Sequence, residues 1–521
     1  MIEIVKSTVL HGLDGRIVQV EVDVSRGLPC FDIVGLPDTS VRESKDRVRA
    51  AIKNSGFEFP VKRITVNLAP ADLKKEGPIY DLPIAVGILA ATEQLPSERC
   101  RFFAYLGELS LNGYLRGVNG ILPSVWAIRE TPSINKVIVP EENAAEAALV
   151  DGVDVLPCGS LAAVGEFLCG ENEINPYQID LKQLMSGKLS EELDFADVKG
   201  QQAAKRALEV AAAGGHNLVM MGSPGSGKTM LARRLPGILP DLTFQESMEA
   251  TKIYSLAGKL EPGTPLVAER PFRAPHHTAS AISIIGGGRV PRPGEVSLAH
   301  NGVLFLDEMP EFHKDALEAL RQPLEDGIVT ISRVNASLTY PARLMLVGAL
   351  NPCPCGYHGD KERECTCTPL QIQRYISRLS GPLLDRIDIC VAVPRMPYED
   401  LSQAEKSDRS RTIKERVTRA RAIQLRRFEG SESKKGYQQS GNCSVYCNAH
   451  MGAREVRLHC KLKKAAEALL RNAFNQLSLS ARSHDRILKV SRTIADLADS
   501  GAIKEEHIAE ALQYRIFDLV R

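Results

Sequence analysis

The chain has 521 residues, 44% of them hydrophobic and 25% charged, and its 65 Lys and Arg against 64 Asp and Glu give a net charge of +1. These are ordinary globular values, which exclude a disordered chain, and the length predicts about three domains. The longest apolar stretch, Leu82 to Ala91, is far shorter than the ~20 residues that span a bilayer. Because residues 1–6 also lack the features of an export signal, we expect a cytoplasmic protein without a membrane partner.

The first 170 residues alternate between predicted strands and helices. Residues 17–24 alternate apolar and polar side chains with period two, which predicts a half-buried strand. A helical pattern over 38–54 and a second strand over 62–68 follow. Residues 171–194 are polar, contain proline and show no clear periodicity, so we predict a linker there.

A glycine-rich turn follows a predicted helix at 201–213 and a short strand at 217–221. The turn fits the phosphate-binding loop pattern in full, with Gly222, Ser223, Pro224, Gly225, Ser226, Gly227, Lys228 and Thr229. In such a loop, successive backbone N–H groups face phosphate oxygens beside a helix N-terminus. Lys228 would neutralise the β- and γ-phosphates, and the Thr229 hydroxyl would bind Mg²⁺. The alternative is a plain surface turn.

Two further apolar strands end in polar residues that suit the same chemistry. Asp307 and Glu308 follow the apolar run 303–306, and Asn351 follows the run 344–350. Because parallel sheets bind ligands at the carboxyl ends of their strands, we expect Asp307 to hold Mg²⁺ and Glu308 to polarise an attacking water. The Asn351 amide could contact the γ-phosphate and that water, unless it only caps a turn. ATP and Mg²⁺ are the expected cofactors.

These three motifs together resemble the AAA+ ATPases, with Asn351 at the sensor 1 position. More narrowly, the segments 270–278, 302–310 and 380–388 are similar to the magnesium-chelatase-like ComM/YifB family, and the resemblance covers nearly the whole chain. It implies an α/β multidomain protein. The expected parts are an α+β N-terminal domain of the ribosomal-S5, Lon-protease-like type at 1–170, a linker at 171–194, an AAA+ core with a parallel sheet at 195–400, and an α-helical lid with a basic insertion at 401–521.

The family also implies a ring, usually a hexamer, with each ATP between neighbouring subunits. Arg386 matches the arginine finger, whose guanidinium would stabilise charge on the neighbour's γ-phosphate. Arg386 could instead simply pair with Asp385 or Asp388 on a helix. Arg482 matches the sensor 2 position at the start of a lid helix, with Arg486 one turn later as its rival.

The Lon-like resemblance raises the question of proteolysis. The Lon serine follows a Gly-Pro pair, and here Gly77 and Pro78 are followed by Ile79. The position of the Lon lysine is taken by Leu122. Neither side chain can act as a nucleophile or a base, so we do not expect protease activity. Whether this domain binds nucleic acid or assists ring assembly stays open.

Four of the twelve cysteines are clustered in two Cys-x-Cys pairs, Cys353 with Cys355 and Cys365 with Cys367. Four thiolates could bind a structural Zn²⁺ tetrahedrally and so pin the loop that follows Asn351. The alternative is a loop with four reduced thiols.

Residues 327–340 predict a hairpin just before the sensor 1 strand. In related AAA+ helicases a hairpin at this place grips the nucleic acid in the channel. The resemblance therefore makes Arg333 the expected DNA phosphate contact, against the alternative of an ordinary surface hairpin.

The neutral total charge hides a basic region, since residues 395–475 contain 18 Lys and Arg against 9 Asp and Glu. Much of the excess falls in one predicted helix, at Arg409, Arg411, Lys414, Arg416, Arg419, Arg421, Arg426 and Arg427. The basic side chains of such a helix could contact DNA phosphates, although a helix face that is merely solvated would also explain the excess of positive charge.

Three functions compete at this point. The resemblance favours an ATP-dependent DNA motor, a branch-migration helicase in recombination during natural transformation, with branched or single-stranded DNA as its partner. A magnesium-chelatase motor that inserts Mg²⁺ into a porphyrin is the alternative, although the fused Lon-like domain argues against it. A noncatalytic DNA-binding or assembly protein fits least well, because the set of nucleotide residues is complete.

Overall fold

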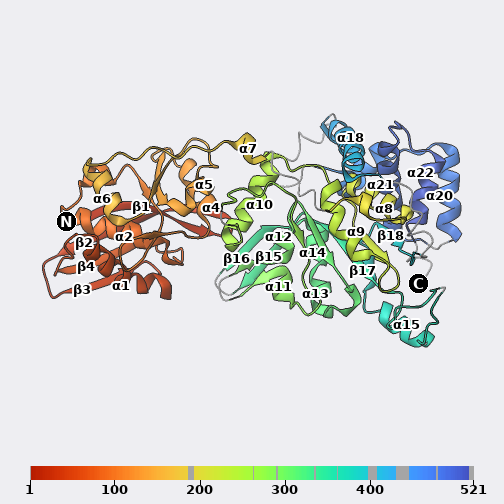
Figure 1. Ribbon diagram of the computed structural model, residues 1–521, viewed down its shortest axis with the longest axis horizontal. Helices are drawn as coiled ribbons and strands as arrows, with labels where there is room; N and C mark the ends of the chain where they lie inside the picture. Colours follow the sequence, from red (N-terminus) through yellow and green to blue (C-terminus); the bar gives the residue numbers. More distant parts are fainter. Residues whose placement is uncertain are drawn as a thin grey trace. The chain divides into compact units, whose positions relative to one another are not determined.

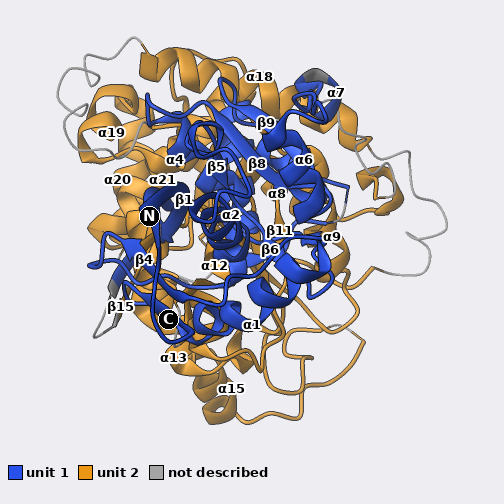
Figure 2. Ribbon diagram, turned by 90° about the vertical axis from the view of Figure 1, so that its left-hand side faces the viewer, with its two compact units in different colours: residues 1–187, 244–268, 334–338 blue, residues 188–243, 269–333, 339–521 orange. Residues whose placement is uncertain are grey.

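The computed structural model describes residues 2–185, 193–261, 263–288, 291–333, 336–360, 362–396, 408–429, 445–476 and 479–515, and Figure 1 shows the chain as a ribbon coloured along the sequence. Its contacts divide the chain into two compact units, drawn in separate colours in Figure 2. Unit 1 contains residues 1–187, 244–268 and 334–338, and unit 2 contains residues 188–243, 269–333 and 339–521.

Unit 1 is built on a seven-stranded mixed sheet in the order β3-β4-β2-β1-β5-β8-β9. The predicted strands near 17–24 and 62–68 and the helix near 38–54 are confirmed as β2, β4 and α1. The strands are β1 (Ile2–His11), β2 (Asp14–Ser25), β3 (Cys30–Val34), β4 (Arg63–Ala69), β5 (Ala104–Tyr105), β8 (Lys136–Pro140) and β9 (Asp154–Cys158), with a separate pair β6 (Glu108–Leu109) and β7 (Leu115–Arg116). The helices are α1 (Thr39–Asn54), α2 (Asp81–Ala91), α3 (Ser97–Cys100), α4 (Ile121–Arg129), α5 (Ala144–Ala147), α6 (Leu161–Cys169), α7 (Leu181–Met185) and α10 (Phe244–Ala257).

The core of unit 1 surrounds α2, which contains the longest apolar stretch of the sequence. Every residue of this helix is buried, and it packs on β1 and β2. A helix that is apolar all round has to be enclosed by protein when it is too short to span a bilayer. None of the helices in the described ranges combines the length and apolar content that a membrane crossing requires. Ile79 and Leu122, which the resemblance to Lon places at the dyad positions, are both buried in this core.

Two segments that the sequence predicted to lie in the linker and in the AAA+ core belong to unit 1 instead. In the expected linker, the Tyr177 N–H donates to the Val155 carbonyl at 2.8 Å, and α7 packs on the core through Leu181 and Leu184. A helix as short as α7 shows no readable periodicity. Within the expected core, α10 packs on α4, and the Lys252 ammonium lies 3.7 Å from the centre of the Trp126 ring. Residues 186–192 lie outside the described part, and the boundaries at 170 and 194 stay predictions.

Unit 2 contains a five-stranded parallel sheet in the order β11-β14-β17-β10-β18. The strands that the motifs require are β10, β14 and β17, and each is paired with at least one of the others. The strands are β10 (Leu218–Met221), β11 (Phe272–Arg273), β14 (Val303–Leu306), β17 (Met345–Leu350) and β18 (Ile389–Ala392), with two separate two-stranded sheets, β12 (Gly286–Gly287) with β13 (Arg292–Pro293) and β15 (Ile328–Arg333) with β16 (Ala336–Pro341), of which residues 336–338 are counted in unit 1.

Helices cover this sheet and form the C-terminal part of unit 2 (Figure 1). The helix α8 packs against β18 and β10, while α18 and α21 pack on α8. The helices are α8 (Gln202–Gly214), α9 (Lys228–Arg234), α11 (Ala281–Ile285), α12 (Glu295–Leu298), α13 (Lys314–Ala319), α14 (Arg321–Asp326), α15 (Pro369–Ile376), α16 (Gly381–Leu384), α18 (Ser410–Glu429), α19 (Ala453–His459), α20 (Lys464–Gln476), α21 (Ala481–Leu497) and α22 (Glu505–Gln513). The mixed α/β class, the parallel sheet and the helical C-terminal region fit an AAA+-like fold, whereas the Lon-like assignment of unit 1 stays a prediction.

Candidate functional site

The phosphate-binding loop lies between the carboxyl end of β10 and the start of α9, which begins at Lys228. Gly225 and Gly227 have φ angles of 78° and 93°, a backbone conformation that side chains with a Cβ rarely adopt. These two glycines let the loop curl tightly before the helix. The Lys228 ammonium donates to the carbonyls of Gly222 at 2.7 Å and Ser223 at 3.0 Å, so the side chain folds back over the loop.

The polar residues after β14 and β17 meet this loop at the carboxyl edge of the sheet. The Thr229 hydroxyl donates to the Asp307 carboxylate at 2.7 Å, and the Lys228 ammonium donates to the Asn351 amide oxygen at 3.2 Å. Residues from three segments that are far apart in the sequence therefore form one cluster. Mg²⁺ prefers hard oxygen ligands, and the Thr229 hydroxyl and the Asp307 carboxylate are such groups lying side by side. The residues present thus fit a bound Mg²⁺.

The electrostatic surroundings of Lys228 favour the binding of an anion beside its ammonium group. Burial lowers the pKa of its ammonium from the ordinary value, and the nearby Asp307 and Glu308 carboxylates offset only part of that effect. A half-desolvated lysine regains its preference for the charged form when a negative group binds next to it. Phosphate oxygens would supply that charge.

Glu308 has an unusual backbone for its residue type. It adopts the left-handed conformation, with φ 51° and ψ 45°, and its side chain is 54% exposed. Non-glycine residues in this region are strained by about 1 kcal/mol or more and cluster at functional sites. The His277 ring nitrogen Nδ1 lies 3.6 Å from the Glu308 carboxylate. The sequence did not predict this contact, because no spacing motif links the two residues.

Arg386 lies at the opposite ends of the strands in the same sheet, just before the amino end of β18. Its carbonyl accepts a hydrogen bond from the Asn217 side chain at 3.0 Å, and Asn217 directly precedes β10. The distance from Asn217 to Gly222 along this strand is about 16 Å at roughly 3.3 Å per residue. The Arg386 guanidinium donates to the Pro382 carbonyl at 2.7 Å and pairs with Glu325. The structure therefore separates Arg386 from the cluster around Lys228.

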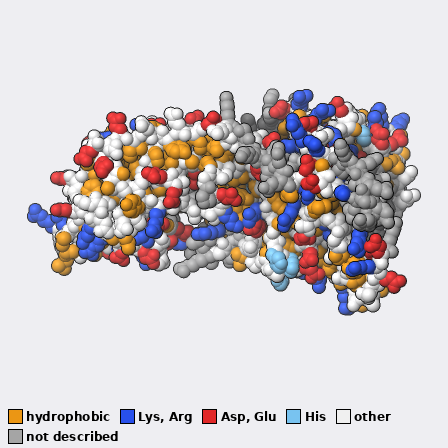
Figure 3. Space-filling model, in the orientation of Figure 1, with side chains coloured by type: hydrophobic (Ala, Val, Ile, Leu, Met, Phe, Trp, Pro, Cys, Tyr) orange, Lys and Arg blue, Asp and Glu red, His pale blue; other side chains and the backbone are white. Residues whose placement is uncertain are grey.

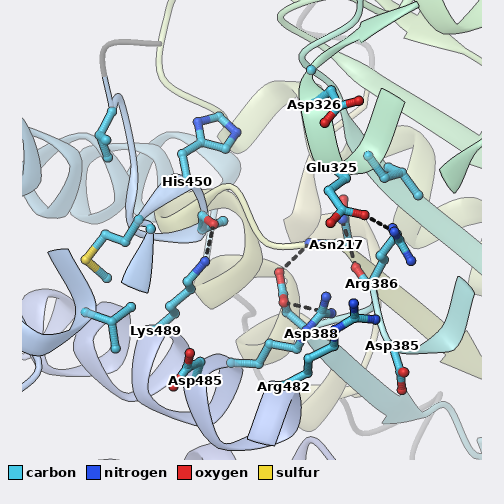
Figure 4. Close-up of a pocket in the computed structure, with 18 of the residues that line it drawn as sticks. Asn217, Glu325, Asp326, Asp385, Arg386, Asp388, His450, Arg482, Asp485 and Lys489 are labelled. Carbon is cyan, nitrogen blue, oxygen red and sulfur yellow. Dashed lines mark hydrogen bonds and ion pairs between the residues drawn. The ribbon is translucent and has the colours of Figure 1, made fainter. Parts of the chain in front are cut away.

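A pocket of about 510 Å³ opens beside Arg386 (Figure 4). Asp388 lies in it, and its carboxylate contacts the Arg486 guanidinium at 3.2 Å, the His216 ring at 3.3 Å and the Asn217 backbone N–H at 3.3 Å. Burial alone raises the pKa of the Asp388 carboxyl, but the Arg486 charge and the hydrogen bond with His216 outweigh it and hold this pKa well below its usual range.

The two candidate sensor 2 arginines differ in their surroundings. Arg486 is largely buried and paired with Asp388, whereas Arg482 is exposed in the first turn of α21. Both line the pocket beside Arg386, and Figure 4 shows Arg482 and Arg386 extending into the same region. A side chain that already neutralises a buried carboxylate is poorly placed to bind a phosphate. This favours Arg482 over Arg486.

The four clustered cysteines come together in the loop between Asn351 and α15. Their Sγ atoms all lie within 4.8 Å of one another, at 3.3 Å for Cys353 and Cys355 and at 3.6 Å from Cys365 to each of these two. None of the four forms a disulfide. Sequence reasoning missed that this loop contacts the phosphate-binding loop, where the Ser223 hydroxyl donates to the Asp360 carboxylate at 2.6 Å.

Many basic side chains of α18 make contacts inside unit 2. Arg416 pairs with Glu209 at 2.5 Å, Lys414 pairs with Asp241 at 2.5 Å, and Arg421 donates to the Ala213 carbonyl at 3.1 Å. Arg427 pairs with Asp496. The exposed arginines of this helix are Arg411, Arg419 and Arg426.

Figure 3 shows Lys and Arg side chains gathered over α18, and the exposed arginines are the ones that remain accessible to a ligand. The predicted DNA contact Arg333 is the last residue of β15, and its side chain lies outside the described part of the chain.

Three protein-family profiles match consecutive parts of the chain. They describe the magnesium chelatase subunit ChlI at residues 194–401, the subunit ChlI of Mg-chelatase at 20–143, and the magnesium chelatase subunit ChlI C-terminal region at 407–515.

Individual proteins are similar over almost the full length. The competence protein ComM of Haemophilus influenzae is 46% identical over 517 residues, covering 98% of this chain and 97% of that protein. The protein YifB of Escherichia coli is 45% identical over 520 residues, covering 99% and 97%. A magnesium-chelatase 67 kDa subunit of Chlorobaculum parvum is 30% identical over 167 residues, covering 30% of this chain and 23% of that subunit.

Proposed function

We propose that this chain, which belongs to the magnesium-chelatase-like ComM/YifB family, is an ATP-hydrolysing motor that moves branched DNA. The observation that carries the ATPase part is the convergence of Lys228, Thr229, Asp307 and Asn351 at the carboxyl edge of the parallel sheet. This edge is where open parallel sheets bind their ligands.

Each residue of that cluster has a role that its position supports. Lys228 would neutralise phosphate charge, while Thr229 and Asp307 would hold the Mg²⁺ that draws negative charge off the transferred phosphoryl group. Glu308, exposed beside the cluster, would orient and polarise the attacking water. Asn351 would sense the γ-phosphate through the same amide that contacts Lys228.

Arg386 and Arg482 lie together at the amino ends of the strands, whereas Lys228 lies at their carboxyl ends. The two arginines therefore could not reach a nucleotide at Lys228 of the same chain, and hydrolysis would require a ring. A chain therefore has its arginine pair at one edge and its phosphate-binding loop at the other. Copies packed edge to edge would complete each nucleotide site with the neighbour's arginines, and a closed ring leaves no site incomplete. We propose a hexamer, the usual ring of this family.

The DNA part of the proposal rests on two supports. One is the name of a relative, the competence protein ComM, at 46% identity over 98% of the chain, and from it we propose a cytoplasmic role in recombination during natural transformation. The other is the exposed basic face of α18, formed by Arg411, Arg419 and Arg426. Arg333 stays a proposed phosphate contact.

A magnesium-chelatase motor subunit is the second candidate, since all three matching profiles are named for that enzyme. The chelatase subunit of Chlorobaculum parvum, however, aligns with only 30% of this chain. The DNA motor therefore has the broader support.

The test measures ATP hydrolysis by the full-length protein with a four-way DNA junction, a linear duplex of the same composition, or a porphyrin with Mg²⁺. We expect the junction to stimulate hydrolysis most, and we expect junction migration only with ATP. A rate that is identical on all DNA forms and rises only with porphyrin would refute the DNA motor and support the chelatase. Lys228→Ala serves as the hydrolysis-dead control.

A further inference from the structure

The four-cysteine loop, residues 352–367, has no hydrophobic core of its own. Within the described residues of this loop, only Cys353 and Gly356 are buried, and the rest are exposed or half-buried. A segment of this length that buries so little apolar surface does not order itself by the hydrophobic effect, and small elements of this kind depend on a disulfide or a metal. Some other interaction has to hold the loop.

The sulfur geometry identifies that interaction. The Sγ–Sγ distances of 3.3 to 3.6 Å among Cys353, Cys355 and Cys365 are far longer than the roughly 2.05 Å of a disulfide, and the Cys367 sulfur lies within 4.8 Å of all three. They are close to the edge of a ZnS₄ tetrahedron, which is about 3.8 Å for Zn–S bonds of about 2.3 Å. The four sulfurs are thus arranged as ligands of one metal ion.

A backbone donor contacts one of the sulfurs. The His358 N–H donates to the Cys353 sulfur at 3.3 Å. Such outer hydrogen bonds orient metal ligands and stabilise their charged form. A set of four cysteines leaves no open coordination position, so the site is structural.

The same loop braces the phosphate-binding loop. Asp360 accepts a hydrogen bond from the Ser223 hydroxyl at 2.6 Å and is itself held by the Glu362 N–H at 2.9 Å. Gly356 approaches so closely that a Cβ there would lie 2.6 Å from the Pro224 ring. The loop also begins directly after Asn351, so it adjoins the nucleotide cluster both at Asn351 and at the phosphate-binding loop.

We propose that Cys353, Cys355, Cys365 and Cys367 bind one structural Zn²⁺, and that this metal positions the phosphate-binding loop for nucleotide binding. The metal holds Gly356 and Asp360 against Pro224 and Ser223. The metal site stands independently, whereas the positioning role rests on the proposed nucleotide site.

The first test measures the zinc content of full-length protein purified without added metal. We expect one zinc per chain in the wild type and its loss in Cys365→Ser/Cys367→Ser. The matched control Cys30→Ser/Cys169→Ser removes two exposed cysteines of unit 1 and should retain the metal. Wild-type protein without zinc, or equal zinc in both double variants, would overturn the metal site.

The second test measures the affinity for a fluorescent ATP analogue. Stripping the zinc with a mercurial reagent and chelator should weaken binding at least tenfold, and Zn²⁺ but not Mg²⁺ should restore it. Asp360→Ala keeps every sulfur ligand, so it should retain zinc and still bind the analogue roughly tenfold more weakly, the cost of one hydrogen bond to a charged group.

The outcomes of these tests separate the two proposals. Unchanged affinity in both the stripped protein and Asp360→Ala would overturn the positioning role. A wild type that holds zinc but does not bind the analogue would refute the ATPase and leave the metal site standing. Asp360→Ala also covers the case in which the cysteine variant fails to fold, because it leaves the metal in place.

Discussion

Substitution of Asp388 by Asn tests the electrostatics of the pocket beside Arg386. The change keeps the size of the side chain and one acceptor oxygen but removes its charge. Arg486, whose side chain is 18% exposed, then loses its partner at 3.2 Å, and His216, which is fully buried, loses a carboxylate at 3.3 Å. The variant therefore leaves a cation in the protein interior without compensation.

The size of the effect follows from this burial. Removing one partner of a buried ion pair costs about 3–5 kcal/mol, and the residual exposure of Arg486 together with the acceptor retained by Asn places this case nearer 2–3 kcal/mol. For a unit of this size, each kcal/mol corresponds to roughly 2–4 °C in the melting temperature. We expect Asp388→Asn to melt roughly 5–10 °C below the wild type.

The assay is thermal unfolding followed by circular dichroism, with Asp485→Asn as the surface control. Asp485 pairs with His484 at 3.1 Å, but its side chain is 49% exposed, so we expect a shift of at most about 2 °C. A drop of the same size in both variants would show that the burial argument is wrong.

The dependence on pH gives a second check. The pKa of Asp388 is depressed in the folded state, so its stabilisation is present above the unfolded-state pKa of about 3.9 and is lost as the pH falls below that value toward the folded pKa. The difference in melting temperature between wild type and Asp388→Asn should therefore be constant from pH 7 to 5 and shrink below pH ~4. A difference that stays constant down to pH 3 would contradict the assigned pKa.

Three further predictions concern the nucleotide cycle. Lys228→Ala should abolish ATP hydrolysis and weaken nucleotide binding, since the buried ammonium beside the loop is lost; wild-type affinity for an ATP analogue would contradict its role. Glu308→Gln should bind ATP normally but hydrolyse it about 10²–10⁴-fold more slowly and accumulate assembled rings in size-exclusion chromatography, whereas wild-type turnover would exclude Glu308 as the residue that polarises water. Arg386→Ala should bind ATP with unchanged affinity yet lose hydrolysis, and mixing it with Lys228→Ala should restore part of the rate, because each variant supplies the half-site that the other lacks. Failure of every mixing ratio to restore hydrolysis would argue against completion of the site by a neighbour.

The sequence was sufficient to predict which residues of the candidate nucleotide site lie together, because its signals are local. The glycine pattern before Lys228 defines the loop conformation, and the apolar runs before Asp307 and Asn351 define buried strands that end in polar groups. In a parallel sheet such ends meet at one edge, so the contacts of Thr229 with Asp307 and of Lys228 with Asn351 followed from the strands alone.

Other features could not be predicted because they depend on packing between distant segments. The basic run of α18 reads as one positive face, but Glu209, Asp241 and Asp496 neutralise several of its charges, and they come from other elements. The contact between His277 and Glu308 and the bond from Ser223 to Asp360 join loops whose approach no sequence spacing encodes.

The sequence by itself determined which residues make up the candidate nucleotide site, since residue type and strand ends set the chemistry that we propose for it. Only the tertiary structure decided where the arginines lie. β18 runs parallel to β10, so Arg386, which precedes β18, is placed at the amino edge of the sheet, away from Lys228 at the carboxyl edge. Strand direction is a property of the assembled sheet, and for that reason the separation of Arg386 from Lys228 became visible only in the fold.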